Sequence, residues 1–386
     1  MRIDSVTPIF IDRYLFVEIT TDTGIVGLGE SGAWAFQEGT AATIDRFAEY
    51  LIGKDPLLIE HHWQYLYRWT HFGGSVVMGA LSAIDIALWD IKGKFHDAPV
   101  HELLGGKVRD RARVYYHVFG ETTDELVAGI SDARTQGYTA VGHLTPFTDA
   151  PRGEPYFETH VQKITSAVEA VERYRDAAGT DVDLGVEIHR RMSPYEAVAF
   201  GNAIERYTPL FLEDPVLPDN IDEMAYVASK INIPIATGER YTSIWEFQML
   251  LSRSGAQMVR PDVCIVGGIT GARKVAALAE ALHVAVVPHN PLSPVSTAAC
   301  LQIAATAPNF LVQEFPNETW GEKGDDRPTP ALLVTGAAEH DGKGFVQISD
   351  APGIGVALQP DAAQRYPYRK REILTRLHVD GSVVDQ

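Results

Sequence analysis

Three glutamates follow short apolar segments at regular intervals along the chain. Glu187, Glu213 and Glu239 each end such a segment, and 26 residues separate each one from the next. An interval of this length holds one strand and one helix, so the three side chains are expected at one rim of neighbouring parallel strands. Converging carboxylates repel one another unless a cation lies between them, and oxygen ligands without cysteine favour Mg2+, with Mn2+ as an alternative. The competing interpretation is three unrelated acids in solvated loops, because the chain has 51 acidic residues.

Other ionisable residues end neighbouring apolar segments. His189 lies two residues after Glu187, and His289 ends a later segment. If the segments are strands of an eight-stranded barrel, the two histidines lie on opposite sides of a ligand held over the barrel axis. Asp262 ends the segment before that of His289 and is expected to hold its imidazole by a hydrogen bond, which makes the imidazole a stronger base. Glu314, near the end of the last segment, is expected to complete the rim and contact the substrate. A histidine taken alone is more often a structural residue, but placement opposite a metal favours catalysis.

Together these groups suit the removal of a proton next to a carboxylate. A cation beside a substrate carboxylate stabilises the negative charge that develops when a base removes the α-proton. A base on one face and an acid on the other then permit loss of a β-hydroxyl as water. A barrel that only binds a ligand is disfavoured, because the three glutamates, the His–Asp pair and the second histidine occur together.

The segments that carry these residues belong to a repeat that covers residues 113–340. Short apolar runs alternate with helical patterns, and eight alternations predict a TIM-type (β/α)8 barrel as the catalytic domain. A doubly wound sheet is the structural alternative, but it usually carries a glycine-rich phosphate-binding turn after its first strand. Here that strand is followed by Gly120-Glu121-Thr122, without such a turn. The predicted strands are Val114–Phe119, Ala140–Leu144, Val182–His189, Leu210–Glu213, Ile233–Glu239, Gln257–Asp262, Val284–His289 and Phe310–Phe315.

Residues 1–112 follow a different pattern, which predicts an N-terminal α+β capping domain. A strand at Phe10–Thr20, a turn at Thr21–Gly24 and a strand at Ile25–Glu30 indicate a hairpin. Residues 341–386 leave the alternation of strands and helices and are expected to pack against this first domain. Helices are predicted at residues 40–52, 57–69 and 76–95.

The composition limits the partners. A net charge of −18 disfavours nucleic acid and anionic membrane surfaces. No apolar run approaches the roughly 18 residues that span a bilayer, and the first residues lack the features of a signal peptide. Two cysteines, Cys264 and Cys300, do not form a disulfide scaffold, so a cytoplasmic protein is expected.

Several longer motifs resemble the mandelate racemase branch of the enolase superfamily, above all its sugar-acid dehydratases, the galactonate and gluconate dehydratases. The resemblance covers nearly the whole chain. Its most specific stretches are Phe211-Leu212-Glu213-Asp214-Pro215-Val216, Gly238-Glu239-Arg240, Arg260-Pro261-Asp262 and Pro288-His289-Asn290-Pro291-Leu292, and Ser82-Ala83-Ile84-Asp85 opens a further one.

The resemblance implies an enolase-superfamily modified barrel that dehydrates an acid sugar. An aldonate such as galactonate or gluconate would give a 2-keto-3-deoxy acid through a metal-stabilised enediolate. The alternative on the same platform is a racemase, epimerase or cycloisomerase of a sugar acid. Relatives commonly assemble as homo-oligomers, and the same is expected here.

The resemblance also implies a role for each candidate residue. One Mg2+ per subunit would be held by Glu187, Glu213 and Glu239, as the spacing also predicts. The His289–Asp262 pair would be the general base and His189 the acid that assists the leaving hydroxyl. Glu314 would hydrogen-bond the substrate carboxylate or enediolate. The capping domain would shape the sugar pocket, and the substrate-binding candidates are Trp34, His71, His143 and Arg240.

The chain departs from the family pattern at three positions. Many relatives have aspartate where this chain has Glu187, and the Gly-Arg that often follows the acid histidine is Arg190-Arg191 here. The second strand lacks the lysine of the racemase and cycloisomerase branches, which argues against those activities. His143 lies in that segment, either as a substrate contact in place of the lysine or as a structural histidine.

Overall fold

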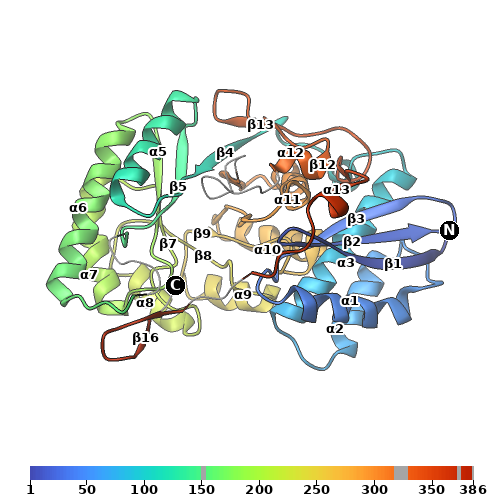
Figure 1. Ribbon diagram of the computed structural model, residues 1–386, viewed down its shortest axis with the longest axis horizontal. Coiled ribbons are helices and arrows are strands. Elements are labelled where there is room, and N and C mark those ends of the chain that lie inside the picture. The colour runs from blue at the N-terminus through green and yellow to red at the C-terminus, as the bar shows by residue number, and fades with distance from the viewer. Residues whose placement is uncertain (149–153, 317–328, 372–374, 385–386) are drawn as a thin grey trace.

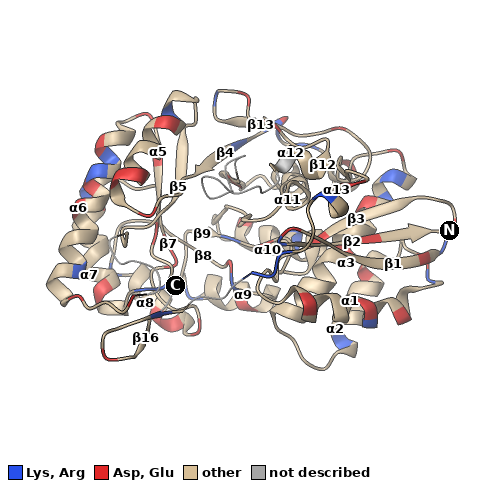
Figure 2. Ribbon diagram, viewed as in Figure 1, with Lys and Arg blue, Asp and Glu red and all other residues tan. Residues whose placement is uncertain are grey.

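The structure is a computed structural model that describes residues 1–148, 154–316, 329–371 and 375–384. Figure 1 shows two parts, an antiparallel sheet with helices at the right and a larger barrel at the left. Acidic and basic residues are interspersed over both parts (Figure 2), so the net charge of −18 is not gathered on one face. None of the helices in the described residues is long and apolar enough to cross a membrane.

The N-terminal part consists of a three-stranded antiparallel sheet and three helices that cover it. We call the sheet and these helices together the cap. Its strand order is β1–β2–β3, and the inner faces of the strands form a core with the helices. The single strand expected over residues 10–20 is wrong, because the chain reverses at Asp12 and Arg13 between two strands. Asp12 has φ 49°, a left-handed conformation that aspartate tolerates, and apolar residues on both sides of it masked the turn. The elements are β1 (Ile3–Ile11), β2 (Tyr14–Thr21), β3 (Val26–Ser31), α1 (Gln37–Leu51), α2 (Ile59–Trp69) and α3 (Ser75–Phe95).

The larger part is a parallel barrel. Its strands follow the order β4 to β10, and β11 lies beside β4. A bridge between Val286 and Phe310, with a hydrogen bond from the Leu311 amide to the Val286 carbonyl, joins β10 to the segment before β11 and closes the ring. The predicted (β/α)8 barrel is therefore confirmed. Its strands are β4 (Arg111–His117), β5 (Ala140–Leu144), β6 (Asp183–Glu187), β7 (Phe211–Glu213), β8 (Ile235–Thr237), β9 (Met258–Val259), β10 (Ala285–Val286) and β11 (Gln313–Phe315).

Helices surround the strands and bury a continuous apolar layer between them. A second, smaller cluster fills the barrel interior, where the rings of Tyr115 and Phe211 pack edge to face. Gly142 and Gly185 leave the room for these rings, since a Cβ atom there would lie 2.4 Å and 2.6 Å from them. The helices are α4 (Val100–Leu103), α5 (Thr123–Thr135), α6 (His160–Ala178), α7 (Pro194–Ile204), η1 (Glu205–Tyr207), α8 (Ile221–Ala228), α9 (Ile244–Ser252), α10 (Gly268–Glu280) and α11 (Pro294–Thr306).

The C-terminal segment touches both parts. Strand β13 pairs with β4 of the barrel, whereas the Asp12 and Arg369 amides exchange hydrogen bonds with the carbonyls of Tyr366 and Asp12. We propose that residues 1–112, joined by residues 341–386, form the capping domain. Residues 113–340 would form the barrel domain. The remaining elements are α12 (Pro330–Leu333), β12 (Val334–Thr335), β13 (Phe345–Gln347), β14 (Ala357–Leu358), α13 (Ala362–Arg365), β15 (Arg376–Leu377) and β16 (Val383–Val384).

Candidate active site

The three evenly spaced glutamates meet at one rim of the barrel. Glu187 ends β6 and Glu213 ends β7, and the two are partners in the register of these strands. Glu239 lies just beyond the end of β8. One carboxylate oxygen from each lies within 4.8 Å of the others, so the three side chains could hold one cation. They converge because neighbouring parallel strands end at the same level.

Two arginines lie among these carboxylates. The buried guanidinium of Arg260 places Nε 2.5 Å from Glu213 Oε1 and Nη2 2.6 Å from Glu314 Oε2. Arg190 places Nη1 2.7 Å from Glu239 Oε1 and 3.1 Å from Asp214 Oδ2. Both arginines therefore neutralise part of the charge that the acids concentrate at this rim.

The charge that remains fits a divalent cation. Burial raises the pKa of Glu187 to about 7, helped by the charge of Glu239, and burial also raises the pKa of Glu213 well above its usual range. A bound cation would relieve this cost of ionisation, and hard carboxylate oxygens are the donors that Mg2+ prefers. Five carboxyl groups surround the two guanidinium groups: Glu187, Glu213, Asp214, Glu239 and Glu314.

The His289–Asp262 pair lies at the next two strand ends. His289 Nδ1 is 2.9 Å from Asp262 Oδ2, and the Cys264 amide donates to Asp262 Oδ1 at 2.8 Å. His289 Nε2 is 3.5 Å from Glu239 Oε2, so this ring borders the carboxylate cluster. Burial alone would lower the pKa of His289, but the charges of Glu239, Glu314 and Asp262 outweigh it and raise the pKa to about 9.

Glu314 is held at the rim by three neighbours. Its Oε2 atom accepts from Arg260 and from the Asn290 amide at 2.8 Å, and its Oε1 atom is 3.6 Å from His117 Nδ1. Burial opposes ionisation, but the charges of Arg260 and His289 outweigh it and lower the pKa of Glu314. Glu314 is therefore a carboxylate directed at the same rim as the three glutamates.

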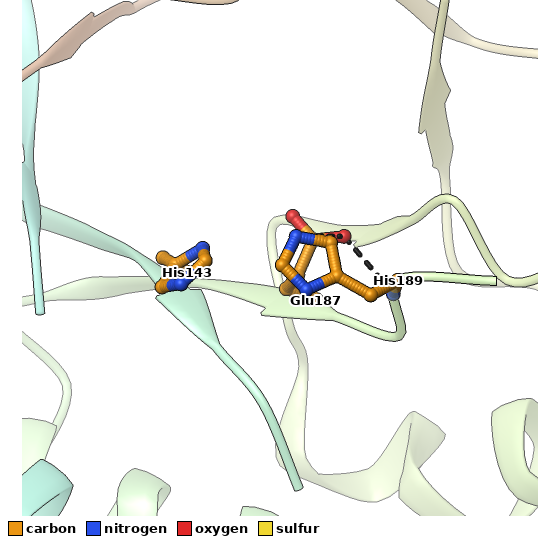
Figure 3. Close-up of side chains that lie close together, drawn as sticks. All are labelled: His143, Glu187 and His189. Atoms are coloured by element: carbon orange, nitrogen blue, oxygen red, sulfur yellow. Dashed lines mark hydrogen bonds and ion pairs between the residues drawn. The ribbon is translucent and has the colours of Figure 1, made fainter. Parts of the chain in front are cut away.

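His189 lies beside Glu187 (Figure 3). Its backbone amide donates to Glu187 Oε1 at 3.1 Å, and its Nε2 atom is 3.6 Å from the same oxygen. Strand β6 ends at Glu187, so the alternation of side chains along a strand does not place the His189 ring. A turn with φ 50° at His189 brings the ring back instead. Burial lowers the pKa of His189 to about 4, so the ring is neutral near pH 7.

His143 joins this group from β5. Its ring is 5.0 Å from that of His189 and 4.3 Å from that of His117, both edge to face. His143 has φ 59°, and the pairing of β5 with β6 is irregular between Val141 and Leu144. Left-handed backbone inside a strand is unfavourable for a residue with a side chain, and such outliers gather at functional sites. The irregularity turns His143 towards His189 and Glu187 (Figure 3).

The other substrate-binding candidates lie farther out. Trp34 is 39% exposed in the loop after β3, and the guanidinium of Arg371 stacks on its ring at 3.7 Å. Gly32 of the same loop approaches the Asp262 carboxylate, so this loop borders the site. His71, after α2, and Arg240, after Glu239, are both exposed, and the structure does not place either side chain within the carboxylate cluster.

Sequence reasoning missed the roles of two buried residues. Arg260 appeared only as part of a motif, although it precedes Asp262 by two residues at the end of the same apolar run. A basic residue at the end of an apolar run, in a chain whose other runs end in acids, was the signal that could have pointed to Arg260. His117 ends β4 and is 3% exposed, but nothing in its surroundings along the sequence distinguishes it.

Comparisons with known proteins cover the chain almost completely. Residues 4–105 match the mandelate racemase/muconate lactonizing enzyme N-terminal domain, and residues 126–362 match the enolase C-terminal domain-like family. D-Galactonate dehydratase of Variovorax paradoxus is 37% identical over 97% of this chain and 96% of its own length. The enzyme of the same name from Cronobacter sakazakii is 36% identical with the same coverage.

Solved structures show the same fold. An enolase from Agrobacterium radiobacter, solved with sodium and L-malate bound, has a TM-score of 0.91 at 28% identity over the whole of both chains. A mandelate racemase/muconate lactonizing enzyme-like protein from Roseovarius has a TM-score of 0.88 at 30% identity, also over both whole chains. The chain therefore belongs to the mandelate racemase/muconate lactonizing enzyme family of the enolase superfamily.

Proposed function

We propose that the protein dehydrates an acid sugar, an aldonate such as galactonate or gluconate, to a 2-keto-3-deoxy acid with the help of Mg2+. The observation that carries this proposal is one rim that combines three converging carboxylates with a His–Asp pair on one side and a second histidine on the other. The D-galactonate dehydratases, similar over nearly the whole chain, support the reaction class.

Glu187, Glu213 and Glu239 would hold one Mg2+, with Mn2+ as a substitute. When bound, the cation supplies positive charge beside the substrate carboxylate, which offsets the charge that develops as the α-proton leaves. The three oxygens within 4.8 Å and the raised pKa values of Glu187 and Glu213 support this assignment. Three protein ligands leave coordination positions for water and substrate.

The two histidines divide the proton transfers. His289 takes the α-proton in its neutral form, which a cation beside Glu239 would favour by offsetting the charge that raises the pKa of His289. Asp262 fixes the ring through Nδ1 and leaves Nε2 directed at the cluster. His189 lies on the opposite flank, beside Glu187. Its ring is neutral in the free protein near pH 7, and the negative charge of the bound substrate would favour the protonated ring that delivers a proton to the departing β-hydroxyl. Loss of the α-proton and of the hydroxyl gives an enol, which becomes the 2-keto acid after a proton is added at the neighbouring carbon.

Glu314, ionised at this rim, completes the site as a hydrogen-bond acceptor for a substrate hydroxyl or a protonated oxygen of the enediolate. His143 contributes a contact to the sugar in place of the family lysine, because its backbone directs the ring at His189. Trp34, His71 and Arg240 would border the outer part of the sugar pocket, where the sugar chain extends from the rim. The protein is further expected to act as a homo-oligomer on a free small molecule.

The test is Mg2+-dependent turnover on a panel of acid sugars, with release of a 2-keto acid as the readout. We expect activity on at least one aldonate. This activity should be lost when a chelator is added and should return with Mg2+. Deuterium incorporation from D2O into unchanged substrate or its epimer, without keto acid from any panel member, would instead support racemisation or epimerisation. Turnover that a chelator leaves untouched would overturn the metal assignment.

A further inference from the structure

Two buried carboxylates of the cap, Glu30 and Asp85, reach the barrel, and each accepts hydrogen bonds at the start of a barrel helix. The helices are α10, which begins shortly after Asp262, and α11, which begins shortly after His289. The first amides of a helix lack partners inside it, and negative charge near them is favourable. Both contacts therefore act on the segments that carry the His–Asp pair.

Glu30, near the end of β3, makes the stronger of the two contacts. Its carboxylate accepts from the Ser293 amide at 3.2 Å, the Ser293 hydroxyl at 2.6 Å and the Ser296 amide at 2.9 Å. Ser293 is the N-cap residue of α11, and Glu30 is completely buried. Burial raises the pKa of Glu30 to about 7, although the hydrogen bonds from Ser293 and Ser296 oppose the rise. Its oxygens are satisfied by three donors of one helix start, so the helix cannot shift without breaking these bonds.

The segment between His289 and Ser293 is short and held at both ends. At its beginning, the Asn290 amide donates to Glu314 at 2.8 Å. At its end, Ser293 is held by Glu30. Because one anchor comes from the barrel and the other from the cap, the backbone that carries His289 depends on how the cap is docked.

The same strand end touches the partner of His289. The Gly32 amide donates to the Cys264 carbonyl at 2.9 Å. A Cβ atom at Gly32 would lie 3.1 Å from Asp262 Oδ1 and 2.7 Å from Ile265 Cγ1. Gly32 does not have a left-handed φ, so the lack of space, and not the backbone conformation, excludes a side chain here.

From these contacts we infer that the cap sets the position of the His289–Asp262 pair, with Glu30 as the positioning residue. The inference rests on the proposed function, in which this pair removes the α-proton. Glu30 does not touch the reacting atoms; it acts through Ser293 on the backbone of His289. A displacement of a catalytic group by about 1 Å lowers a rate by roughly 100-fold, so a small shift of this segment is enough to matter.

The test compares Glu30→Gln with Glu18→Gln in the Mg2+-loaded enzyme. Gln has the size of Glu without its charge, and Glu18 lies on the neighbouring strand β2 of the same sheet. In Glu30→Gln we expect kcat and α-proton exchange to fall together by roughly 10- to 100-fold. KM and the Mg2+ dissociation constant should stay at their wild-type values, and Glu18→Gln should behave as wild type. Equal losses of Mg2+ affinity and activity would indicate a general structural role and overturn the inference.

A second variant and a second readout make the result independent of folding and of substrate. Gly32→Ala should show the same selective loss, whereas Gly39→Ala, whose Cβ would meet only Val76 at 3.8 Å, should not. The imidazole NMR signals of His289 should shift in Glu30→Gln without any substrate. Unchanged signals and unchanged kcat would overturn the inference. α-Proton exchange that survives in His289→Asn would instead refute the proposed base. The His289 NMR signals of the Glu30→Gln protein would still report on the role of Glu30.

Discussion

At the scale of single residues, the site works by crowding carboxyl groups around a place for a cation. Glu213 is the central one, because it is buried between Glu187 and Arg260 and its pKa is raised well above the usual range by burial. Arg260 binds Glu213 on one side and Glu314 on the other, so it also sets the distance between the proposed metal ligands and the acid proposed to contact the substrate.

Replacement of Glu213 by Gln should abolish activity without unfolding the protein. The change removes one ligand charge at constant size, and we expect kcat/KM to fall by at least roughly 100-fold, or about 3 kcal/mol of transition-state stabilisation. Steady-state kinetics over a range of Mg2+ concentrations and a melting curve check this. A variant with near wild-type activity at low Mg2+ would sink the ligand assignment.

Substitutions of His289 and His189 should differ in their effect on exchange of the substrate α-proton with solvent. His289→Asn should lose dehydration and α-proton exchange together, because it removes the base. His189→Asn should lose dehydration, by roughly 100-fold or more, yet still exchange the α-proton, since general acid catalysis usually contributes 100- to 10,000-fold. NMR of a good substrate in D2O measures both rates. The opposite result, with exchange lost only in His189→Asn, would reverse the roles.

At the scale of elements, strand β5 takes an unusual path. Its irregular pairing with β6 and the left-handed backbone at His143 bring a histidine to the site from a strand that lacks the family lysine. We predict that His143→Gln raises KM by roughly 10-fold, the value of one lost hydrogen bond to a bound substrate, and leaves α-proton exchange at saturation intact. Wild-type kinetics in His143→Gln would favour a structural histidine. A loss of exchange as large as in His289→Asn would mean that His143 is the base.

The barrel strands also depend on two glycines that admit aromatic rings. At Gly185 a Cβ atom would lie 2.6 Å from the Phe211 ring inside the barrel. Gly185→Ala should therefore destabilise the fold by about 1–3 kcal/mol, the usual cost of overpacking, and shift the rim that ends at Glu187. Denaturant unfolding beside the control Gly39→Ala measures this. Equal stabilities of the two variants would show that the interior adjusts without strain.

At the scale of the whole molecule, the cap and the barrel share buried polar contacts. Asp85 of α3 accepts from the Thr270 amide at 3.0 Å at the start of α10, and the indole of Trp63 donates to the Gly267 carbonyl at 2.9 Å. Burial raises the pKa of Asp85 to about 7, although the hydrogen bonds from Thr270 oppose it. The interface is thus sensitive to the protonation of a buried cap residue.

This interface should lose stability as the pH rises. A raised carboxyl pKa means that the folded protein keeps a proton that the unfolded chain releases near pH 4. The contribution of Asp85 is therefore full below pH 4 and is lost as the pH passes about 7. Relative to Asp85→Asn, which cannot titrate, the wild type should lose up to roughly 4 kcal/mol over this window, at about 1.4 kcal/mol per pKa unit. The exposed Glu60–Lys274 ion pair is the nearby charge that modulates it.

Unfolding free energies of both proteins between pH 4 and 8, without metal, test this. The exposed Asp45→Asn serves as the matched control, and its difference from wild type should stay constant with pH. A constant difference for Asp85→Asn as well would show that Asp85 does not titrate in this range.

The sequence by itself determined the residues of the rim, because they end apolar runs and parallel strands align such ends. The bounds of β5 agree with the apolar run at residues 140–144. The runs for β9 and β10 were longer than the two-residue strands observed, since buried residues beyond a strand are as apolar as those within it.

Only the tertiary structure decided how distant segments meet. The pairing of Arg260 with Glu213 and Glu314 and the docking of Glu30 on Ser293 are contacts between different elements. The turn that returns His189 to Glu187 is a loop conformation at the end of β6. Hydrophobic periodicity indicates which face of an element is buried, but it does not identify the polar residues that this face contacts. Those partners depend on loop conformations and on the fit of cap to barrel, and neither leaves a periodic trace along the chain.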